Sequence, residues 1–545
     1  MPSFPRIGLS ALVLALATTF PASAAGIPRS AASAGPVVDA PAGKFSGITT
    51  QGMNAYLGIR YAKPPVGALR WQPPQPFAKP GADVKAKAFG NHCPQIGSAF
   101  GQTSLDEDCL FLNVFTPTTL PSNPHLPVMV WIHGGAFTSG ESDDYDPDRF
   151  VANGAIVVTL NYRLGLLGFL AVPALDRSGR PSVNYGLMDQ QAALRWVAAN
   201  ISAFGGDPRR VTIFGESAGG LSVFSQLASP GATGLFSAAL IESGSYQLEL
   251  PTLAASEAAG TQTAEALGCT KDIASCLRAV PVATLLATEA SMTVPTVDGT
   301  VLPASPGDAF AAGTFNRVPI VDGTNHDEYR LFVAGDFDLG PNGPITPAEY
   351  PALIEASLGP TAGAEVVAEY PLANYPSPDV AFATLVTDYI FSCPALGADV
   401  ALAKRVPLFA YEFSDENAPE PYLPPVSFPY AAAHASELQF IWDSFTRTNP
   451  PLTTAEQALG KTMVGYWTQF AALHAPLEQG APIWFPFFSP FDSIQAFVPP
   501  TPGRTYGIAF AADHKCAFWA ALASGSSATK ATLGDIRSAA RRMRR

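Results

Sequence analysis

Charged residues are scarce in this chain, and its cations are outnumbered. Only 14% of the 545 residues are charged, with 32 Lys and Arg against 45 Asp and Glu, and the net charge is −13. Binding to phosphate-rich surfaces needs clustered cations, so we expect no nucleic acid and no anionic membrane as a partner. Hydrophobic residues make up 47% of the chain, which is enough for a large buried core.

Long apolar runs are also missing. No segment after residue 25 has 18 uninterrupted apolar residues, so the sequence predicts no stable membrane insertion. The run Ile7–Phe20 is too short to span a bilayer with its flanks, follows a positive charge and precedes small residues. This order is typical of a signal peptide. We predict that residues 1–25 are removed by cleavage near Ala24 or Ala25, and that the protein is secreted or periplasmic.

Cysteine is rare, and its spacing does not indicate a metal centre. The chain has no C-x-x-C pair and no nearby His pair, so we expect no metal and no cofactor. An even number of cysteines in an exported chain favours disulfides. Six cysteines allow 15 pairings, and spacing alone does not choose among them. The six are Cys93, Cys109, Cys269, Cys276, Cys393 and Cys516.

Short apolar segments alternate with helical patterns along the chain. Apolar runs that end in turn residues predict strands at Leu126–Phe137, Ala155–Gly165, Ala238–Ser245 and Val318–Asn325, and periodicity predicts a helix at Asn184–Gly206. This alternation is typical of an α/β fold with a large, mostly parallel central sheet flanked by helices. The 52 prolines, many between periodic segments, predict long loop excursions.

One short stretch points to chemistry. Ser217 stands between Gly215 and Gly219, after an apolar strand pattern and before a helical one. This G-x-S-x-G pattern in a strand–turn–helix context is the nucleophile elbow, in which a strained turn exposes the serine hydroxyl. We therefore predict that Ser217 is a nucleophile.

A serine nucleophile needs a base, which is oriented by an acid, and in this fold both follow the serine in the chain. His434, His474 and His514 come late enough. His474 ends an amphipathic helix and His514 adjoins a cysteine, so both are interpreted as structural. His434 lies after a Pro-rich loop and is the candidate base, whereas His133 precedes the glycines of an earlier loop and is expected to shape it.

The acid candidates lie within seven residues at one strand end: Asp322, Asp327 and Glu328. Asp327 and Glu328 are neighbours and should point in different directions, so at most one meets His434. Position alone leaves the choice open.

Five separate motifs carry a family resemblance. The segments are Tyr56–Pro76, Ser104–Pro117, Phe204–Gly220, Gly323–Phe332 and His434–Trp442. In this order they resemble the signatures of type-B carboxylesterases, the cholinesterase, carboxylesterase and lipase family of α/β-hydrolases. The resemblance spans nearly all of residues 26–545 and implies a single α/β-hydrolase domain there.

The resemblance also implies roles for individual residues. It implies a catalytic triad of Ser217, Glu328 and His434. It implies an oxyanion hole formed by the backbone N–H groups of Gly135, Ala136 and Ala218, where Ala136 replaces a glycine common in the family. It implies that Glu216 and Ser243 support the triad.

The same resemblance implies covalent and ionic links. The implied disulfides are Cys93–Cys109, Cys269–Cys276 and Cys393–Cys516. The implied ion pairs are Arg70–Glu107 and Arg163–Asp189.

The implied activity is hydrolysis of small-molecule carboxylic esters through an acyl-enzyme intermediate. The segment between Cys93 and Cys109 contains no Trp. Cholinesterases carry a choline-binding Trp there, so we expect a general esterase. A lipase, or an amidase or peptidase with the same triad, is an alternative activity. A binding module without catalysis is a further alternative, disfavoured because all three triad positions are intact. The resemblance implies neither a particular ester nor an oligomeric state.

Overall fold

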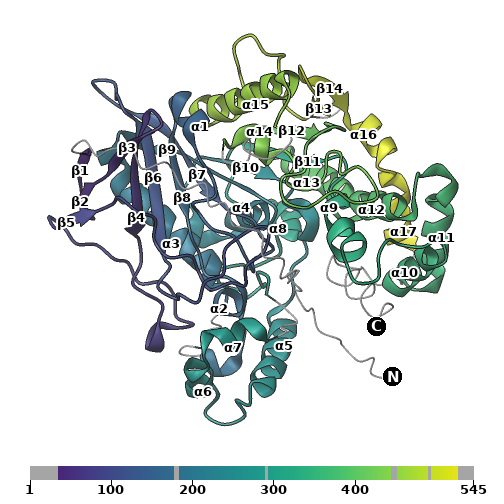
Figure 1. The fold of residues 1–545 in the computed structure, drawn as a ribbon, viewed down its shortest axis with the longest axis horizontal. Helices are drawn as coiled ribbons and strands as arrows, with labels where there is room; N and C mark the ends of the chain where they lie inside the picture. Colours follow the sequence, from purple (N-terminus) through teal and green to yellow (C-terminus); the bar gives the residue numbers. More distant parts are fainter. Residues whose placement is uncertain (1–34, 177–182, 289–292, 444–450, 489–491, 526–545) are drawn as a thin grey trace.

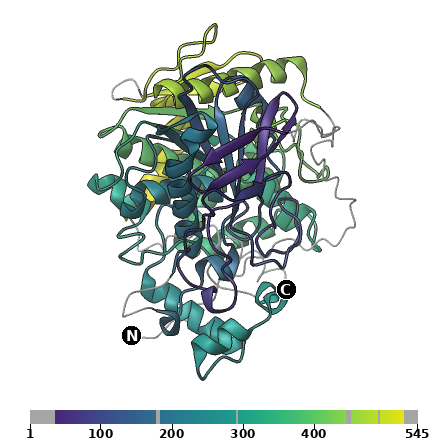
Figure 2. The same cartoon turned by 90° about the vertical axis from the view of Figure 1, so that its left-hand side faces the viewer.

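A computed structural model describes residues 35–176, 183–288, 293–443, 451–488 and 492–525. The predicted signal peptide, residues 1–25, lies outside the described residues. The described chain is built around an eleven-stranded sheet, with strand order β14-β13-β12-β11-β10-β9-β7-β8-β6-β4-β3 (Figure 1). A small sheet of order β1-β2-β5 lies at the side of the molecule that holds the N-terminal strands (Figure 2).

The strands are short, as their apolar runs predict. Those of the large sheet are β3 (Ile48–Thr50), β4 (Met53–Arg60), β6 (Phe111–Pro117), β7 (Leu126–Ile132), β8 (Ile156–Leu160), β9 (Gly206–Glu216), β10 (Ala238–Glu242), β11 (Ile320–Asn325), β12 (Leu408–Phe413), β13 (Ser493–Phe497) and β14 (Gly503–Tyr506). Those of the small sheet are β1 (Val37–Ala40), β2 (Gly43–Ser46) and β5 (Asp83–Lys85). The predicted large, mostly parallel sheet is confirmed, because seven adjacent strands run parallel: β8, β7, β9, β10, β11, β12 and β13. The edges are antiparallel: β3, β4 and β6 on one side and β14 on the other.

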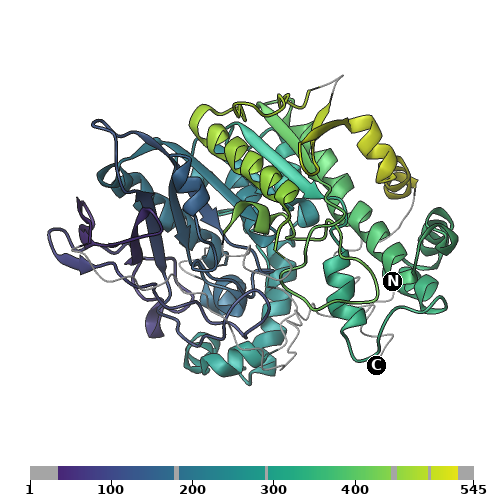
Figure 3. The same cartoon turned by 45° about the horizontal axis from the view of Figure 1, so that its top comes forward.

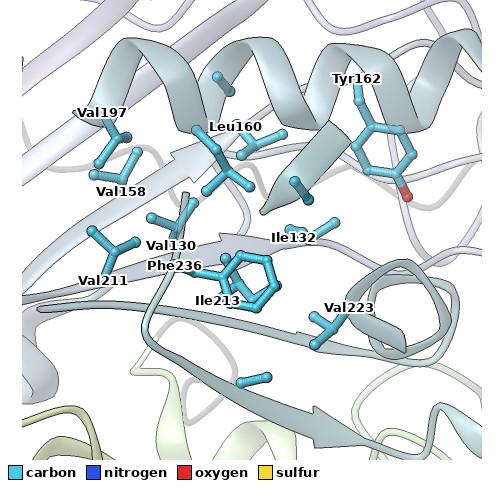
Figure 4. Close-up of a cluster of buried hydrophobic side chains, with 14 of the residues drawn as sticks. Val130, Ile132, Val158, Leu160, Tyr162, Val197, Val211, Ile213, Val223 and Phe236 are labelled. Carbon is cyan, nitrogen blue, oxygen red and sulfur yellow. The ribbon is translucent and has the colours of Figure 1, made fainter. Parts of the chain in front are cut away.

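Both faces of the sheet are buried. Side chains alternate along a strand, so Val130 and Ile132 of β7 belong to one core cluster, and Met129 and Trp131 to another. Figure 4 shows the first cluster, in which Val130 and Ile132 lie with side chains from neighbouring strands and helices. Burial on both sides explains why these strands are continuous apolar runs rather than alternating ones.

Helices cover each face. The helices α3 (Tyr185–Asn200), α4 (Ala218–Ala228), α8 (Pro306–Ala312) and α13 (Cys393–Leu402) contribute to the first cluster. The helices α1 (Asp148–Ala152), α14 (Leu438–Ile441) and α15 (Thr454–Leu473) contribute to the second. In Figure 3 the long helix α15 lies over the strands on that face, and it contacts β7 and β9.

Two helical excursions extend from the sheet and have cores of their own. The helices α2 (Gly165–Phe169), α5 (Leu253–Ala266), α6 (Ile273–Ala279) and α7 (Val282–Ala287) gather at the bottom of Figure 1. The helices α9 (Arg330–Val333), α10 (Glu349–Leu358), α11 (Pro360–Glu369), α12 (Pro378–Val386) and α17 (Cys516–Gly525) lie on the right, with the π-helical segment η8 (Thr387–Ser392) following α12. The helix α16 (Gly507–Asp513) contacts α17 but contributes Phe510 to the first cluster of the sheet. These excursions match the long loops that the prolines predict.

The three disulfides pair as the resemblance implies. They are Cys93–Cys109, Cys269–Cys276 and Cys393–Cys516. The two implied ion pairs also form, with Arg70 Nη2 2.5 Å from Glu107 Oε1 and Arg163 Nε 2.7 Å from Asp189 Oδ2. Disulfides are typical of extracellular and secreted proteins.

One continuous helical stretch, Pro378–Leu402, is long and apolar enough to cross a membrane by length and composition alone. Its most apolar 18-residue window is 67% buried inside the protein. It packs as a core helix beside β11 and β12.

A pair of buried carboxyl groups joins β11 to α13. Asp322 and Asp399 are both buried, and their side chains interact. Burial raises the pKa of Asp322 to about 8, and burial together with Asp322 raises the pKa of Asp399 well above its ordinary range. Asp322, one of the three acid candidates, therefore belongs to a strand and a buried acid pair.

This pair should make the protein less stable as the pH rises. The folded state holds a proton that the unfolded chain releases near pH 4, so the free energy of unfolding should fall between about pH 4 and pH 8. Asp322→Asn should remove much of that decline. At alkaline pH its free energy of unfolding should exceed that of the parent by on the order of 1 kcal/mol or more. Denaturant unfolding at several pH values measures this. Asp83→Asn, at a side chain that is 81% exposed, is the control and should leave the decline unchanged. An equal decline in Asp322→Asn would contradict the prediction.

Candidate active site

Ser217 occupies a strained turn between β9 and α4. Its φ and ψ are 57° and −120°, a conformation that non-glycine residues rarely adopt, and its N–H donates to the Glu242 carbonyl at 2.9 Å. A Cβ atom at Gly215 or Gly219 would come within 3.0 Å of the Ile132 carbonyl oxygen of β7. These glycines are therefore required by the close approach of strand and helix, as expected for a nucleophile elbow.

Three side chains from distant parts of the chain meet at this turn. Ser217 Oγ lies 2.7 Å from His434 Nε2, and His434 Nδ1 lies 2.6 Å from Glu328 Oε2. His434 is 4% exposed and Glu328 is fully buried. The rings of Phe332 and Phe391 lie 5.0 and 5.3 Å from the imidazole and limit its movement. The arrangement can pass a proton from the serine hydroxyl to an oriented imidazole.

The structure separates the three acid candidates. Glu328 Oε1 accepts hydrogen bonds from the Thr324 hydroxyl and the Asn325 N–H, both at 2.8 Å, which leaves Oε2 for His434. Asp327 points elsewhere, with Oδ1 2.8 Å from Arg330 Nη2. Asp322 lies in β11. Only Glu328 among them contacts His434 in the described structure.

The loop after β7 approaches Ser217 from the other side. A Cβ atom on Gly134 would lie 3.2 Å from Ser217 Cβ. Gly135 and Ala136 have φ values of 94° and 54°, which turn the backbone sharply. Among the residues that the structure describes, no oxygen accepts a hydrogen bond from either N–H group. Ala218 is the first residue of α4, where an N–H has no acceptor within the helix.

Buried carboxyl groups surround the imidazole. Glu216 Oε1 lies 3.1 Å from His434 Nε2. Burial and the neighbouring Glu328 raise the pKa of Glu216 well above its ordinary range. Glu437 accepts a hydrogen bond from Asn325 Nδ2, and burial, Glu216 and other acids raise its pKa likewise. Neutral carboxyls at these two positions avoid repulsion with Glu328.

A small cavity of about 40 Å³ opens beside Glu216 and the Gly134–Gly135 turn. Its lining is largely aromatic and apolar: Ala99, Phe100, Gly134, Gly135, Asp144, Tyr145, Glu216, Tyr422, Ala435 and Leu438. Burial and neighbouring acids raise the pKa of Asp144 well above its ordinary range. Two carboxyl groups in this lining are therefore favoured in their neutral forms at neutral pH.

The other histidines considered from the sequence make different contacts. His133 is buried, stacks on Tyr162 at 4.5 Å, and burial lowers its pKa to about 4, in keeping with a role in shaping the loop. His474 follows the last residue of α15. His514 lies beside the Cys393–Cys516 bridge, as expected, and its carbonyl faces Cys393 Sγ at 3.3 Å.

Ser243 behaves differently from the other implied residues. It is buried, and its N–H donates to the Gly323 carbonyl at 2.8 Å, but its hydroxyl has no hydrogen-bond partner among the described residues. The Thr324 hydroxyl and the Asn325 backbone N–H hold Glu328, and sequence reasoning missed both. Their place at the end of a strand that precedes the acid is the signal that could have indicated them.

Comparison with known proteins bears on the family of this chain. The profile of the Carboxylesterase family matches residues 34–497. The chain belongs to the carboxylesterase family. It is a serine carboxylesterase with the α/β-hydrolase fold, and its family resemblance is confirmed.

Similar proteins cover most of the chain. Para-nitrobenzyl esterase of Bacillus subtilis (strain 168) is 37% identical over 460 residues, which is 80% of this chain and 89% of that protein. Fumonisin B1 esterase of Sphingopyxis macrogoltabida is 34% identical over 524 residues, 90% of this chain and 92% of that protein. Cocaine esterase of Homo sapiens is 32% identical over 497 residues, 86% and 87% respectively. Hydrolysis of small-molecule esters is the activity common to the carboxylesterase family.

Proposed function

We propose that this carboxylesterase acts through a Ser217–His434–Glu328 triad and an acyl-enzyme intermediate. The observation that carries the proposal is the pair of short contacts, 2.7 Å from Ser217 Oγ to His434 Nε2 and 2.6 Å from His434 Nδ1 to Glu328 Oε2. His434 Nε2 takes the hydroxyl proton as Ser217 Oγ attacks the ester carbonyl, and the imidazolium then protonates the leaving alcohol. In deacylation, water attacks the acyl carbon as His434 Nε2 takes its proton. The imidazolium then returns that proton to Ser217 Oγ, and the carboxylic acid leaves.

The oxyanion of each tetrahedral intermediate is proposed to bind the N–H groups of Gly135, Ala136 and Ala218. Two of these N–H groups have no acceptor among the described residues and the third begins α4, so all three are available. The positive end of the helix favours a negative charge there. Ala136 donates as glycine does, and its methyl group reduces the space beside the acyl carbon. Donors fixed before reaction contribute a large share of rate enhancement, because they meet charge only as it develops.

The substrate proposed is a neutral small-molecule ester. The cavity beside Glu216 is lined by Phe100, Tyr145 and Tyr422, and its two carboxyl groups are favoured as neutral acids. The alcohol part of a cationic ester would therefore contact aromatic rings but little negative charge. The proposal includes export, with residues 1–25 removed and residues 26–545 acting as one catalytic domain.

Aryl esters of graded acyl length test this function. We expect turnover of short and medium acyl chains, abolished by a serine-directed organophosphate. Turnover that persists after stoichiometric organophosphate modification would contradict the serine mechanism. A matched series of aryl amides separates the amidase alternative, and we expect those substrates to be turned over far more slowly.

Choline esters should not be preferred over neutral esters of the same shape. We expect acetylcholine and 3,3-dimethylbutyl acetate, which replaces the ammonium by a carbon, to have kcat/KM values within about tenfold, since an exposed cation–π contact contributes only about 1 kcal/mol. A preference for choline of a hundredfold, lost on adding tetraalkylammonium ions, would overturn this reading of the cavity.

The rate should increase with pH through a single ionisation. A general base must be unprotonated to accept the serine proton, so kcat/KM should be low in acid and level off towards neutral pH. The measurement is kcat/KM for a neutral ester across the acid and neutral range. A flat profile over that range would count against a histidine base.

A further inference from the structure

Two histidines and a glutamate meet at the carboxyl ends of β11 and β12. His326 follows β11, and Glu412 is the last residue but one of β12, which pairs with β11 in parallel. His514 follows α16 and brings the C-terminal helices to the same point. One ligand atom from each of the three side chains lies within 4.8 Å of the other two. His514 Nε2 is already 2.8 Å from Glu412 Oε1.

We propose that His326, Glu412 and His514 bind one Zn²⁺ ion that clamps the C-terminal helices to the sheet. Two imidazoles and a carboxylate, with water in the fourth position, form a zinc ligand set that is known from open zinc sites, whereas closed structural sites have four protein ligands. Zinc bonds of about 2.0 to 2.2 Å place tetrahedral ligand atoms about 3.3 to 3.6 Å apart. The His514–Glu412 contact of 2.8 Å therefore has to widen to admit the ion, and His326 has to approach.

Carboxylates contact the ring nitrogens of both imidazoles. Asp388 Oδ1 lies 2.7 Å from His514 Nδ1 and so directs Nε2 towards Glu412. Asp388 is itself fixed by the Tyr370 hydroxyl, which donates to Oδ2 at 2.7 Å. A carboxylate on the remote nitrogen is the arrangement that orients zinc-binding histidines. His326 has Asp327 near Nδ1 and Asp513 near Nε2, at 3.3 and 3.4 Å.

Charge and access suit a divalent cation. Four carboxylates contact the two imidazoles: Asp327, Asp388, Glu412 and Asp513. Among the described residues, the Arg330 guanidinium pairs with one of these carboxylates, Asp327. Although burial opposes it, these acids raise the pKa of His326 to about 11 and that of His514 to about 9. Zn²⁺ therefore has to displace a proton from each imidazole, and its charge then replaces that of the two protons. The His514 side chain is 3% exposed whereas that of His326 is 37% exposed, so an ion can reach the site from the His326 side.

A second three-residue group makes a useful comparison. His92 has Glu141 Oε2 3.0 Å from Nδ1 and Asp143 Oδ1 2.8 Å from Nε2. The two carboxylates lie on opposite nitrogens of one ring, so an ion held by one nitrogen meets only one of them. The second imidazole is what distinguishes the His326–Glu412–His514 group.

The spacing of these three residues in the sequence does not indicate a metal site. His514 is 102 residues from Glu412, and His326 reaches them only because β11 and β12 are neighbours. The site shares no residue with the proposed triad, although His326 lies two residues before Glu328.

Equilibrium dialysis of the chelator-treated full chain against Zn²⁺ tests the proposal. We expect one Zn²⁺ per chain, a higher melting temperature with the ion, and the visible spectrum of tetrahedral Co²⁺ when cobalt replaces zinc. Mg²⁺ and Ca²⁺ should not raise the melting temperature, since both prefer all-oxygen sites.

The decisive variant is His326→Gln, because this half-exposed side chain can be replaced without opening the core. It should bind Zn²⁺ at least tenfold more weakly and lose the zinc-dependent rise in melting temperature. His92→Gln, in the comparison group, and His125→Gln, at an exposed histidine, should bind as the parent does. Failure of the parent to bind one equivalent, unchanged binding in His326→Gln, or loss of binding in His92→Gln alone would each overturn the proposal.

Discussion

Ser217→Ala is expected to lower kcat for a neutral ester by on the order of a millionfold while the fold is retained. The large effect follows because the side chain supplies the nucleophile itself, and loss of the serine in a comparable triad has an effect of that size. The fold should persist because the N–H of residue 217 still donates to the Glu242 carbonyl and alanine fits wherever serine does. Stopped assays at high enzyme concentration, with circular dichroism and a melting curve, measure both.

Ser225→Ala is the matched control for this variant. Ser225 is buried in α4, eight positions along the chain, and its hydroxyl donates only to the Leu221 carbonyl at 2.8 Å. The control should keep activity within a few-fold of the parent. If Ser217→Ala retains more than about a thousandth of kcat, another residue is the nucleophile.

Glu328→Gln is expected to lower kcat by on the order of a thousandfold or more with little change in melting temperature. A glutamine amide facing His434 Nδ1 donates a hydrogen bond, which selects the tautomer whose Nε2 carries a proton and cannot accept one from Ser217. The amide oxygen can still accept from Thr324 and Asn325, so the local structure is preserved. Steady-state kinetics and thermal unfolding of the same preparation measure the two effects.

Asp327→Asn is the neighbouring control, and it should behave in the opposite way. Asp327 pairs with Arg330 at 2.8 Å and makes no described contact with His434. We expect this variant to lose about 1.5 to 3 kcal/mol of stability, the range for a hydrogen bond to a charged group, and to keep most of its kcat. A dead Asp327→Asn beside an active Glu328→Gln would reverse the assignment of the acid.

Much of the fold could be predicted from local pattern. Burial on both faces makes a strand such as β7 or β8 a continuous apolar run, and the elbow glycines are dictated by a backbone approach that no other residue allows. The antiparallel edges were not predicted, because pairing direction depends on where distant strands meet and leaves little trace in composition.

The site was predictable to a similar extent. Ser217, Glu328 and His434 stand in motifs with recognisable neighbours, so each could be named from the sequence. The contacts of Thr324 and Asn325 with Glu328 were not, because they depend on how the turn after β11 folds back. Ser243 was expected to support the triad, yet its hydroxyl contacts no described polar group. The zinc ligand set is likewise a product of strand order rather than of spacing.

The central claim is that Ser217 carries the acyl group during turnover. The most direct measurement is peptide mapping by mass spectrometry after the enzyme has reacted with one equivalent of a serine-directed organophosphate, with residual activity followed in the same sample. We expect a single adduct on Ser217 and loss of activity in proportion to its formation. An adduct on a different residue that tracks the loss of activity, or full activity in a sample fully modified at Ser217, would contradict it.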